Sequence, residues 1–570
     1  MPADRGGRAT PELLLGPVLR HVGVDDATVW VETDAPCEVE VLGAPQRTFC
    51  VAGHHYALVC VEGLAPAART AYEVRLDGRT RWPEPGSPYP APVIATLDPS
   101  RPFRMMFGSC RVALPHEQPY TLEKDQDGRG RGDDALRVLA RQMLGAGDGH
   151  EWPDLLLLLG DQVYADEVSP GTLERIRATR GTDRPPGEEI ANYEEYTWLY
   201  RESWSEPTIR WLLSTVPTAM VIDDHDMHDD WNISRAWLEE MRRRDWWEER
   251  LLGGLASYWV YQHLGNLDPQ ALADSDLYRR VRGAGDAWGE LRQFAADDDR
   301  RHEGVRWSYT RDLGRTRLLV LDDRTGRILD EGERRIIDPR TWAWVVEQCG
   351  RDVEHLVIGV SDPAFMAPGL SWLESWGEAV CEGRWGRLAA RAGERLRRAA
   401  DLDHWPAFRR SFRDLAELLA EVGSRDRAPA SITLLSGDVH HAYLAQVGFR
   451  RPAGVTSAVH QAVCSPFRNA LDHRERRGVR LAGTRAVIAA ARALAHAAGV
   501  TDPPVGWRLV EGPYFDNQVG TLVLDGRRAT VALDKTVADD GAPDGARLER
   551  VFERPLTPSA GRGGLSSSPR

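Results

Sequence analysis

The sequence predicts an α/β core preceded by a small antiparallel β-sandwich. Short, continuous apolar runs lie within residues 154–166, 219–224 and 432–437. Such runs are typical of strands that are covered on both faces, as in the middle of an α/β sheet. Residues 16–98 instead alternate apolar and polar residues between turn signals, which is the pattern of an antiparallel sandwich. A chain of 570 residues is also long enough for two domains.

The predicted domain boundaries follow these changes of pattern. Residues 1–12 and 556–570 are predicted to be disordered, residues 13–100 to form a fibronectin-like β-sandwich, and residues 101–555 to form the α/β domain. Within the sandwich, Leu64 and Tyr72 loosely match the tyrosine corner of fibronectin type III-like domains.

Four stretches of the α/β domain have patterns of their own. Residues 192–213 and 234–264 carry aromatic or apolar residues at helical spacing and are predicted as helices with one buried face. Residues 374–402 are predicted as an Arg-, Ala- and Glu-rich helical insertion. Residues 169–189 are rich in Gly, Pro and charge and are predicted as a loop or lid.

Composition argues against several classes of protein. A net charge of −14 and a pI near 5.7 are unfavourable for coating nucleic acid or anionic membranes, so no stable nucleic-acid binding is expected. A phosphate substrate is still allowed, because bound metal cations can reverse the local charge. The seven cysteines are scattered, and neither a signal peptide nor a membrane span of roughly 18–20 apolar residues is seen, so a cytoplasmic protein is expected. The sequence does not indicate the oligomeric state.

Polar residues with metal-binding side chains follow the predicted strands. In order along the chain they are Cys110, Asp161, Tyr164, Asp223, Asp224, His225, Asp226, Asp438, His440 and His441. Ligands of open α/β sheets bind at the carboxyl ends of strands, and these donors suit a centre of two or more metals. Each residue alone has a structural explanation as a turn, cap or core residue. Three strands that end in the same way favour a metal site.

An ordered set of motifs resembles the alkaline phosphatase D, or PhoD-like, metallophosphatase family. The set comprises FGSC at 107–110, GDQVY at 160–164, DDHD at 223–226 followed by Trp231-Asn232, LDDR at 321–324, DHWPAF at 403–408, SGDVHH at 436–441 and CSPFRN at 464–469. The resemblance spans roughly residues 103–533. It implies a calcineurin-like, four-layer α/β/β/α metallophosphoesterase core with a dinuclear or larger metal centre.

The resemblance also implies a set of metal ligands. Asp161 would bridge the metals, and Cys110 and Tyr164 would bind a ferric ion. Asp438 or His440 would complete the shell of that ion. Asp224 would bind a second, harder metal such as Ca²⁺. Fe(III) with Ca(II) is the pair that the resemblance implies, and Zn(II), Mn(II) or Fe(II) are alternatives.

The same resemblance implies the residues that act on the substrate. Metal-bound hydroxide would attack the phosphate, and His225 would protonate the leaving group as general acid. Arg324, Arg468 and His441 are candidates for binding the phosphoester, although a structural salt bridge is the favoured alternative for each arginine.

The sequence thus predicts a metal-dependent phosphoesterase for phosphate mono- or diesters of small molecules or polymers. The alternative is a non-catalytic, metal-stabilised interaction module, which the acidic clusters would also fit. A serine hydrolase has little support, because no G-x-S-x-G elbow stands before a helix.

Overall fold

The computed structural model describes residues 10–146, 152–301, 305–450, 454–539, 541 and 545–558. The predicted disordered ends lie mostly outside these ranges. Where they are described, they pack on their neighbours: the N–H of Glu12 donates to Asp34 Oδ1 at 2.7 Å, and Leu556 is buried. The ordered chain therefore extends a few residues beyond both predicted limits.

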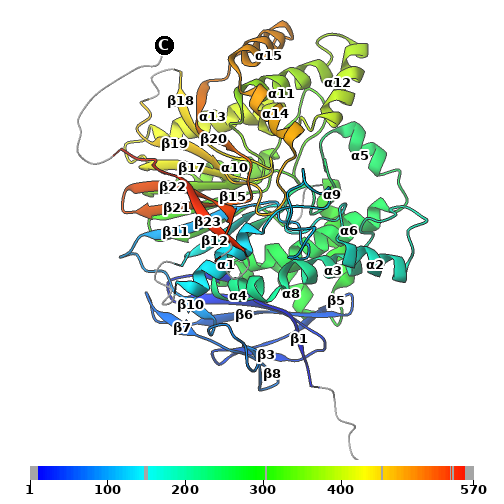
Figure 1. Cartoon of the computed structure of the whole chain (residues 1–570), viewed down its shortest axis with the longest axis vertical. Coiled ribbons are helices and arrows are strands. Elements are labelled where there is room, and N and C mark those ends of the chain that lie inside the picture. Colours follow the sequence, from blue (N-terminus) through cyan, green and yellow to red (C-terminus); the bar gives the residue numbers. More distant parts are fainter. Residues whose placement is uncertain are drawn as a thin grey trace, which may run out of the picture.

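The N-terminal strands form two facing antiparallel sheets (Figure 1). In the described part of the chain, one sheet has the order β1 (Leu13–Val22), β2 (Asp26–Thr33), β6 (His54–Glu62) and β5 (Phe49–Val51). The other has the order β4 (Ala44–Arg47), β3 (Glu38–Val41), β8 (Val74–Leu76) and β9 (Arg79–Trp82), and β7 (Arg69–Ala71) pairs with β10 (Val93–Ala95). Apolar residues from both sheets, including Val29 and Val39, share one buried core.

A second pair of sheets forms the centre of the molecule. Among the described residues, six strands have the order β13 (Thr218–Val221), β12 (Leu155–Leu159), β11 (Phe103–Gly108), β21 (Gln518–Asp525), β22 (Arg528–Ala538) and β23 (Ala546–Pro555). Seven more have the order β14 (Tyr309–Leu313), β15 (Thr316–Leu321), β16 (His355–Val360), β17 (Ser431–Ser436), β19 (Ala458–Val463), β18 (Ala442–Phe449) and β20 (Val505–Tyr514). The neighbours β11–β12–β13 are parallel, and so are β15–β16–β17–β19.

These two sheets face each other and carry helices on their outer faces (Figure 1). Leu157 of β12 and Val357 of β16 belong to one apolar cluster between the sheets. The outer face of the six-stranded sheet packs against α1 (Ala135–Gly145), α3 (Tyr193–Trp204), α4 (Pro207–Thr215) and α6 (Trp247–Ser257). The outer face of the seven-stranded sheet packs against α10 (Pro339–Gln348) and α13 (Arg409–Gly423). The expected mixed α/β fold is confirmed.

The remaining helices lie around this framework. They are α2 (Pro170–Thr179), α5 (Arg235–Met241), the π-helical turn η1 (Tyr258–His263), η2 (Leu264–Asn266), α7 (Pro269–Asp274), α8 (Asp276–Gly283), α9 (Trp288–Arg301), α11 (Pro368–Cys381), α12 (Arg387–Ala399), η3 (Trp405–Ala407), α14 (His473–Ala482) and α15 (Arg485–Ala497). In Figure 1, α11, α12, α14 and α15 lie at the end opposite the N-terminal sheets.

Local capping changes several predicted elements. The predicted loop at 169–189 contains α2, because the Ser169 side chain accepts the N–H of Thr172 and Pro170 opens the helix. The predicted helix at 192–213 is two helices, since Pro207 starts α4 and the Glu206 side chain caps it. The predicted helix at 234–264 is likewise broken, by the exposed run 242–245. The predicted insertion at 374–402 is α11 and α12, and α11 begins earlier, at Pro368.

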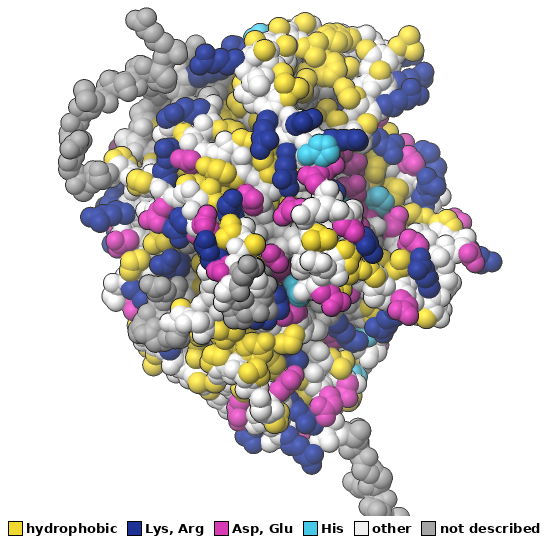
Figure 2. All heavy atoms as spheres, viewed as in Figure 1, with side chains coloured by type: hydrophobic (Ala, Val, Ile, Leu, Met, Phe, Trp, Pro, Cys, Tyr) yellow, Lys and Arg dark blue, Asp and Glu magenta, His cyan; other side chains and the backbone are white. Residues whose placement is uncertain are grey.

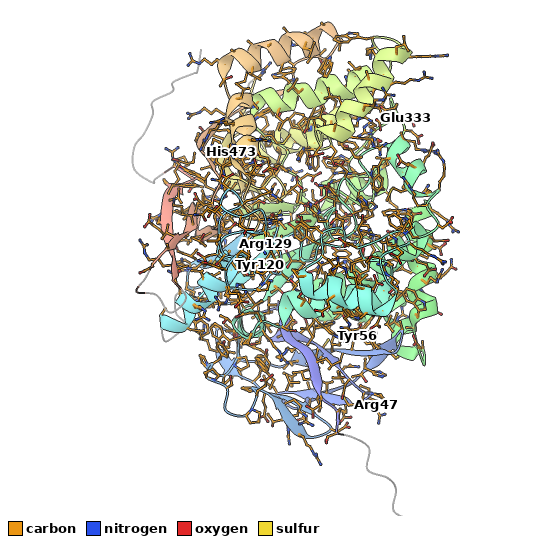
Figure 3. The ribbon with its side chains drawn as sticks, turned by 45° about the vertical axis from the view of Figure 1, so that its right-hand side comes forward. Arg47, Tyr56, Tyr120, Arg129, Glu333 and His473 are labelled. Carbon is orange, nitrogen blue, oxygen red and sulfur yellow. The ribbon has the colours of Figure 1, made fainter. Side chains whose placement is uncertain are left out.

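The sandwich is joined to the central domain by buried polar contacts. Arg20 of β1 donates to the carbonyls of Tyr261 (3.1 Å) and Gln262 (2.5 Å) and to Asn266 Oδ1 (3.0 Å). Asn266 in turn bonds both backbone groups of Met220 in β13. The Tyr56 hydroxyl, at the same junction (Figure 3), lies 3.1 Å from that of Tyr261. The sandwich thus supports the strand β13, which leads to Asp223.

The tyrosine of the predicted tyrosine corner does not hydrogen-bond within its own domain. The Tyr72 hydroxyl donates to the carbonyl of Ser214 in α4 at 2.6 Å. A tyrosine corner would bond to backbone of the sandwich itself. Tyr72 therefore serves the contact between the domains.

The surface carries charges of both signs. Figure 2 shows Lys and Arg side chains interspersed with Asp and Glu over this face, without one dominant basic area. None of the described helices is long and apolar enough to cross a bilayer.

Candidate metal centre

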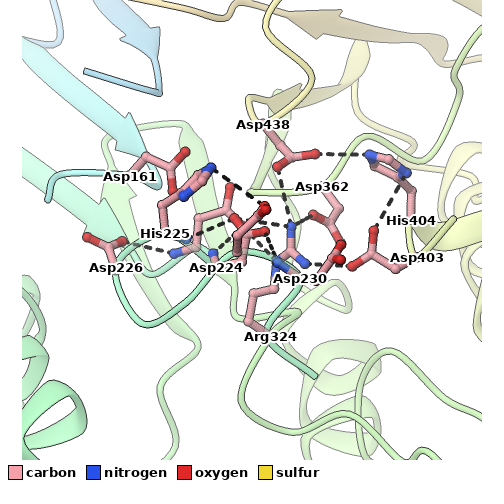
Figure 4. Close-up of polar contacts among 12 residues, drawn as sticks. Asp161, Asp224, His225, Asp226, Asp230, Arg324, Asp362, Asp403, His404 and Asp438 are labelled. Carbon is pink, nitrogen blue, oxygen red and sulfur yellow. Dashed lines mark hydrogen bonds and ion pairs between the residues drawn. The ribbon is translucent and has the colours of Figure 1, made fainter. Parts of the chain in front are cut away.

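Strand ends from both central sheets meet at one rim. The three parallel strands β11, β12 and β13 and the three parallel strands β15, β16 and β17 all finish there. The polar residues that follow these strands are Cys110, Asp161, Asp223, Asp224, Asp323, Arg324, Asp362 and Asp438. Figure 4 shows five of them, together with His225 and His404, directed into one space.

The backbone at this rim is held in an unusual conformation. Cys110, Asp161, Asp438 and His440 have φ angles of 56°, 51°, 63° and 51°. Residues with side chains seldom adopt this left-handed region, and such residues cluster at functional sites, where the surrounding structure enforces the strain. Here each strained residue has a side chain that can bind a metal.

Two glycines allow the strand ends to approach each other. Gly160 has a φ of 105°, and a Cβ on it would collide with Asp223. A Cβ on Gly437 would collide with the side chain of Ser109. The Ser109 hydroxyl accepts the N–H of Asp438 at 3.0 Å, so it ties β11 to β17 across the two sheets.

Cys110, Asp161 and His440 form the first candidate metal group. One ligand atom from each lies within 4.8 Å of the others. The Tyr164 hydroxyl donates to Asp161 Oδ2 at 3.3 Å, which brings the fourth predicted ligand to the same place. Burial lowers the pKa of His440 to about 3, so its imidazole is neutral and can offer a lone pair.

Two more groups adjoin the first. Asp161, Asp224 and His225 form one, and Asp223, Asp224 and Asp438 form the other, each within 4.8 Å. Asp161 thus belongs to two groups, as a residue that bridges two metals would. All six predicted metal ligands lie at this rim. The Asp438 side chain belongs to the third group, and its backbone carbonyl accepts from Cys110 Sγ at 3.4 Å.

The charge of the site fits bound cations. Asp161 Oδ1 is buried and has no hydrogen-bond partner among the described residues. Burial, followed by the charge of Asp223, raises the pKa of the Asp161 carboxyl well above its ordinary value. Burial and then Asp161 likewise raise the pKa of the Cys110 thiol. A metal ion would supply the missing positive charge and use these lone pairs.

His225 is oriented by a carboxylate. Its Nδ1 lies 3.0 Å and 3.1 Å from the two oxygens of Asp166, and its ring centroid lies 4.6 Å from that of Tyr164, with the two planes tilted by 33°. Burial would lower the pKa of His225, but Asp166, followed by Asp224, raises it well above its ordinary value. Asp166 therefore fixes the orientation of a ring that itself belongs to the second candidate metal group.

Arg324 is buried beneath the site rather than facing outward. Its Nε donates to Asp223 Oδ1 at 2.6 Å, Nη1 to Asp403 Oδ2 at 2.7 Å, and Nη2 lies 2.8 Å from Asp362 Oδ1. Arg327 also contacts Asp403 and Asp362. The geometry supports the ion-pair alternative for Arg324 and gives no support to a phosphate contact.

Arg468 and His441 are also held by protein groups. Arg468 donates to the carbonyls of Gly132, Leu114, Pro115 and Tyr120. His441 Nδ1 lies 2.6 Å from the carbonyl of Val439, and its ring lies between those of Tyr443 and Phe515. Neither residue belongs to a candidate metal group. Their contacts are with the protein itself and do not support a role in binding substrate.

The sequence reasoning missed several residues of the site. They are Asp166, Asp362, Glu374 and His404. Asp362 follows the apolar strand β16 by two residues, the same signal that identified Asp161 after β12. His404 lies in the DHWPAF motif. Glu374 lies in a helix and carries no local signal.

Comparisons with known proteins agree with this arrangement. A family model described as "PhoD-like phosphatase" matches residues 148–499, more than half of the chain. A model described as a domain of unknown function (DUF7800) matches residues 10–94. A solved structure titled "Structure of PhoD" superposes with a TM-score of 0.57 at 11% identity, over 96% of this chain and 91% of that chain. No curated protein matches the sequence. A maltogenic amylase structure from S. marinus, at a TM-score of 0.17 and 9% identity over 95% and 82% of the chains, has no bearing on the fold.

Proposed function

Because the chain belongs to the PhoD-like phosphatase family, we propose that it is a metal-dependent phosphoesterase that hydrolyses phosphate mono- or diesters. The observation that carries this proposal is the pair of candidate metal groups that share Asp161. The buried, unpartnered Oδ1 of Asp161 supports it further.

The donor set favours two different metals. Thiolate and phenolate from Cys110 and Tyr164 are strong donors that suit Fe(III), and the carboxylate of Asp224 suits a harder ion such as Ca(II). Zn(II), Mn(II) or Fe(II) would be accepted by the same donors. When bound, the metals would neutralise phosphate oxygens and acidify a coordinated water.

His225 is the residue that we propose to protonate the leaving group. Asp166 holds its Nδ1, which leaves Nε2 as the atom that can deliver a proton to an ester oxygen. The surrounding carboxylates favour the protonated ring before the reaction. The same position also allows His225 to bind a metal.

Two broader features belong to the same proposal. The helix, sheet, sheet, helix arrangement supports a four-layer, calcineurin-like core with an appended N-terminal sandwich. All seven cysteines are free, which supports a reducing compartment such as the cytoplasm.

Hydrolysis of an aryl phosphate mono- or diester by protein that retains its metals tests the function. We expect turnover by the wild type and its loss in Asp161→Asn, which keeps the shape of the side chain but removes its charge. Asp525→Asn, at the exposed end of β21, is the matched control and should be fully active. Bound metal without hydrolysis of any phosphoester would favour the non-catalytic alternative.

The role of His225 is tested by varying the leaving group. A general acid matters most when the leaving alkoxide is a strong base. His225→Gln should therefore slow an alkyl ester much more than a nitrophenyl ester, whereas His228→Gln should leave both rates near those of the wild type. An equal loss on both esters, accompanied by loss of metal, would identify His225 as a ligand instead.

A further inference from the structure

A fully buried carboxylate on α11 is connected to the metal centre through one histidine. Glu374 has no exposed surface, and its Oε1 lies 2.7 Å from His404 Nδ1. His404 Nε2 lies 2.9 Å from Asp438 Oδ2, a contact drawn in Figure 4. The chain of contacts therefore runs from a helix at the outer end of the molecule to a candidate metal ligand.

The pairing of Glu374 differs from that of its neighbour on the same helix. Glu378, one turn later and also buried, accepts from both the N–H and the Nε of Arg409, at 2.9 Å and 2.6 Å. Glu374 has only His404, and its Oε2 has no hydrogen-bond partner among the described residues. Burying a carboxylate with one partner costs stability. The burial of Glu378 is explained by its ion pair with Arg409. The burial of Glu374 needs another explanation.

The position of Asp438 explains why Glu374 is buried with a single partner. Its Oδ2 is held by His404 and its Oδ1 by Arg324 Nη2 at 3.3 Å, on a backbone strained at φ 63°. Groups that hydrogen-bond to a metal ligand fix its orientation, and their loss typically costs about 10–100-fold in metal affinity or activity. An aspartate without such support could rotate away from the metal.

We propose that Glu374 and His404 are positioning residues that orient Asp438 toward the metals, and that α11 supplies this function to the site. Glu374 fixes the imidazole of His404, and the imidazole fixes the carboxylate of Asp438. The inference rests on the proposed function, because it requires Asp438 to be a metal ligand.

The test compares Glu374→Gln with Glu378→Gln in the full chain. For protein purified with its metals, the loss of metal to EDTA is followed by elemental analysis, and kcat and KM are measured on an aryl phosphate. We expect Glu374→Gln to lose metal about 10–100-fold faster, with a lower kcat and a nearly unchanged KM. Glu378→Gln should lower Tm while metal retention and kcat stay at the wild-type level. Equal metal retention in the two variants would overturn the proposal.

A second pair of variants gives a test that does not depend on the folding of Glu374→Gln. The amide of Gln can replace the Nε2 donor of His404, whereas Leu cannot. His404→Gln should therefore retain metal better than His404→Leu, and equal loss from both would count against positioning. If the wild type retains metal but hydrolyses no phosphoester, the proposed function fails, and the metal-retention comparison still decides this inference.

Discussion

Negative charge is balanced in different ways in the two halves of the metal centre. In the arginine half, Asp223, Asp362 and Asp403 surround the buried guanidinium groups of Arg324 and Arg327. In the open half, Cys110, Asp161, Tyr164 and His440 converge without an arginine or lysine among their described contacts. Both halves are largely buried and carry carboxylates. The comparison teaches that the open half, which lacks a guanidinium group, depends most on an added cation for its charge balance.

The largest expected effect comes from breaking the arginine half. Arg324→Met would leave Asp223, Asp362 and Asp403 short of their shared counter-charge. Removing one partner of a buried ion pair typically costs about 3–5 kcal/mol of the free energy of unfolding. Urea denaturation of metal-free protein measures it. Arg317→Met is the control, because its partner Asp312 is half exposed, and a comparable loss there would contradict the special role of Arg324.

Metal removal should act through the open half. A ligand present at about 100 times its Kd stabilises the folded state by about 2.7 kcal/mol. Chelation should therefore lower the Tm of the wild type and of a surface control such as Asp525→Asn. The Tm of Asp161→Asn should scarcely change, because that variant binds metal weakly from the start. An equal shift in Asp161→Asn would place the metal elsewhere.

Neutralising one aspartate in each half should change the free energy of unfolding of metal-free protein in opposite directions. Asp161→Asn removes a buried charge together with its repulsion from Asp223 and Asp224, so it should stabilise the fold. Asp223→Asn breaks the 2.6 Å contact with Arg324 and should destabilise it. Chemical denaturation with excess EDTA measures both. If both variants changed the free energy of unfolding in the same direction, the distinction between the two halves would be wrong.

The smallest effect is expected at Tyr164. Tyr164→Phe removes a 3.3 Å hydrogen bond to Asp161 and should cost about 1 kcal/mol or less without metal. If the site holds Fe(III), the same change should abolish a visible tyrosinate absorption band. Tyr120→Phe, outside the candidate metal groups, serves as the control. A band that persists in Tyr164→Phe would mean that Tyr164 is not bound to iron.

The open half could be predicted from sequence better than the arginine half. Cys110 and Asp161 each follow an apolar strand by two residues, so a local pattern identifies them, and parallel strands bring their ends together. For Arg324 the sequence offered both a phosphate contact and a salt bridge, the favoured alternative. The sequence did not identify the partners Asp223 and Asp403, which lie 101 and 79 residues away. Glu374 lies in a helical stretch where a buried and an exposed glutamate look alike in sequence.

The elements of the fold were predictable where apolar periodicity determines them. They were less predictable where a single helix-capping residue does. The strands before Asp161 and Asp438 are where the apolar runs place them. The helix α2 was missed, because one serine hydroxyl and one proline outweigh a composition typical of loops. The link between Tyr72 and α4 is a contact between domains, which the sandwich pattern does not encode.

The left-handed backbone at Cys110, Asp161, Asp438 and His440 has a practical consequence for mutagenesis. Alanine removes the donor atom but keeps the steric conflict of a Cβ at positive φ, so an alanine scan would mix lost chemistry with retained strain. Glycine removes the donor and releases the strain together. A glycine scan of these four positions, compared with alanine at each, would therefore measure how much conformational energy the backbone stores there.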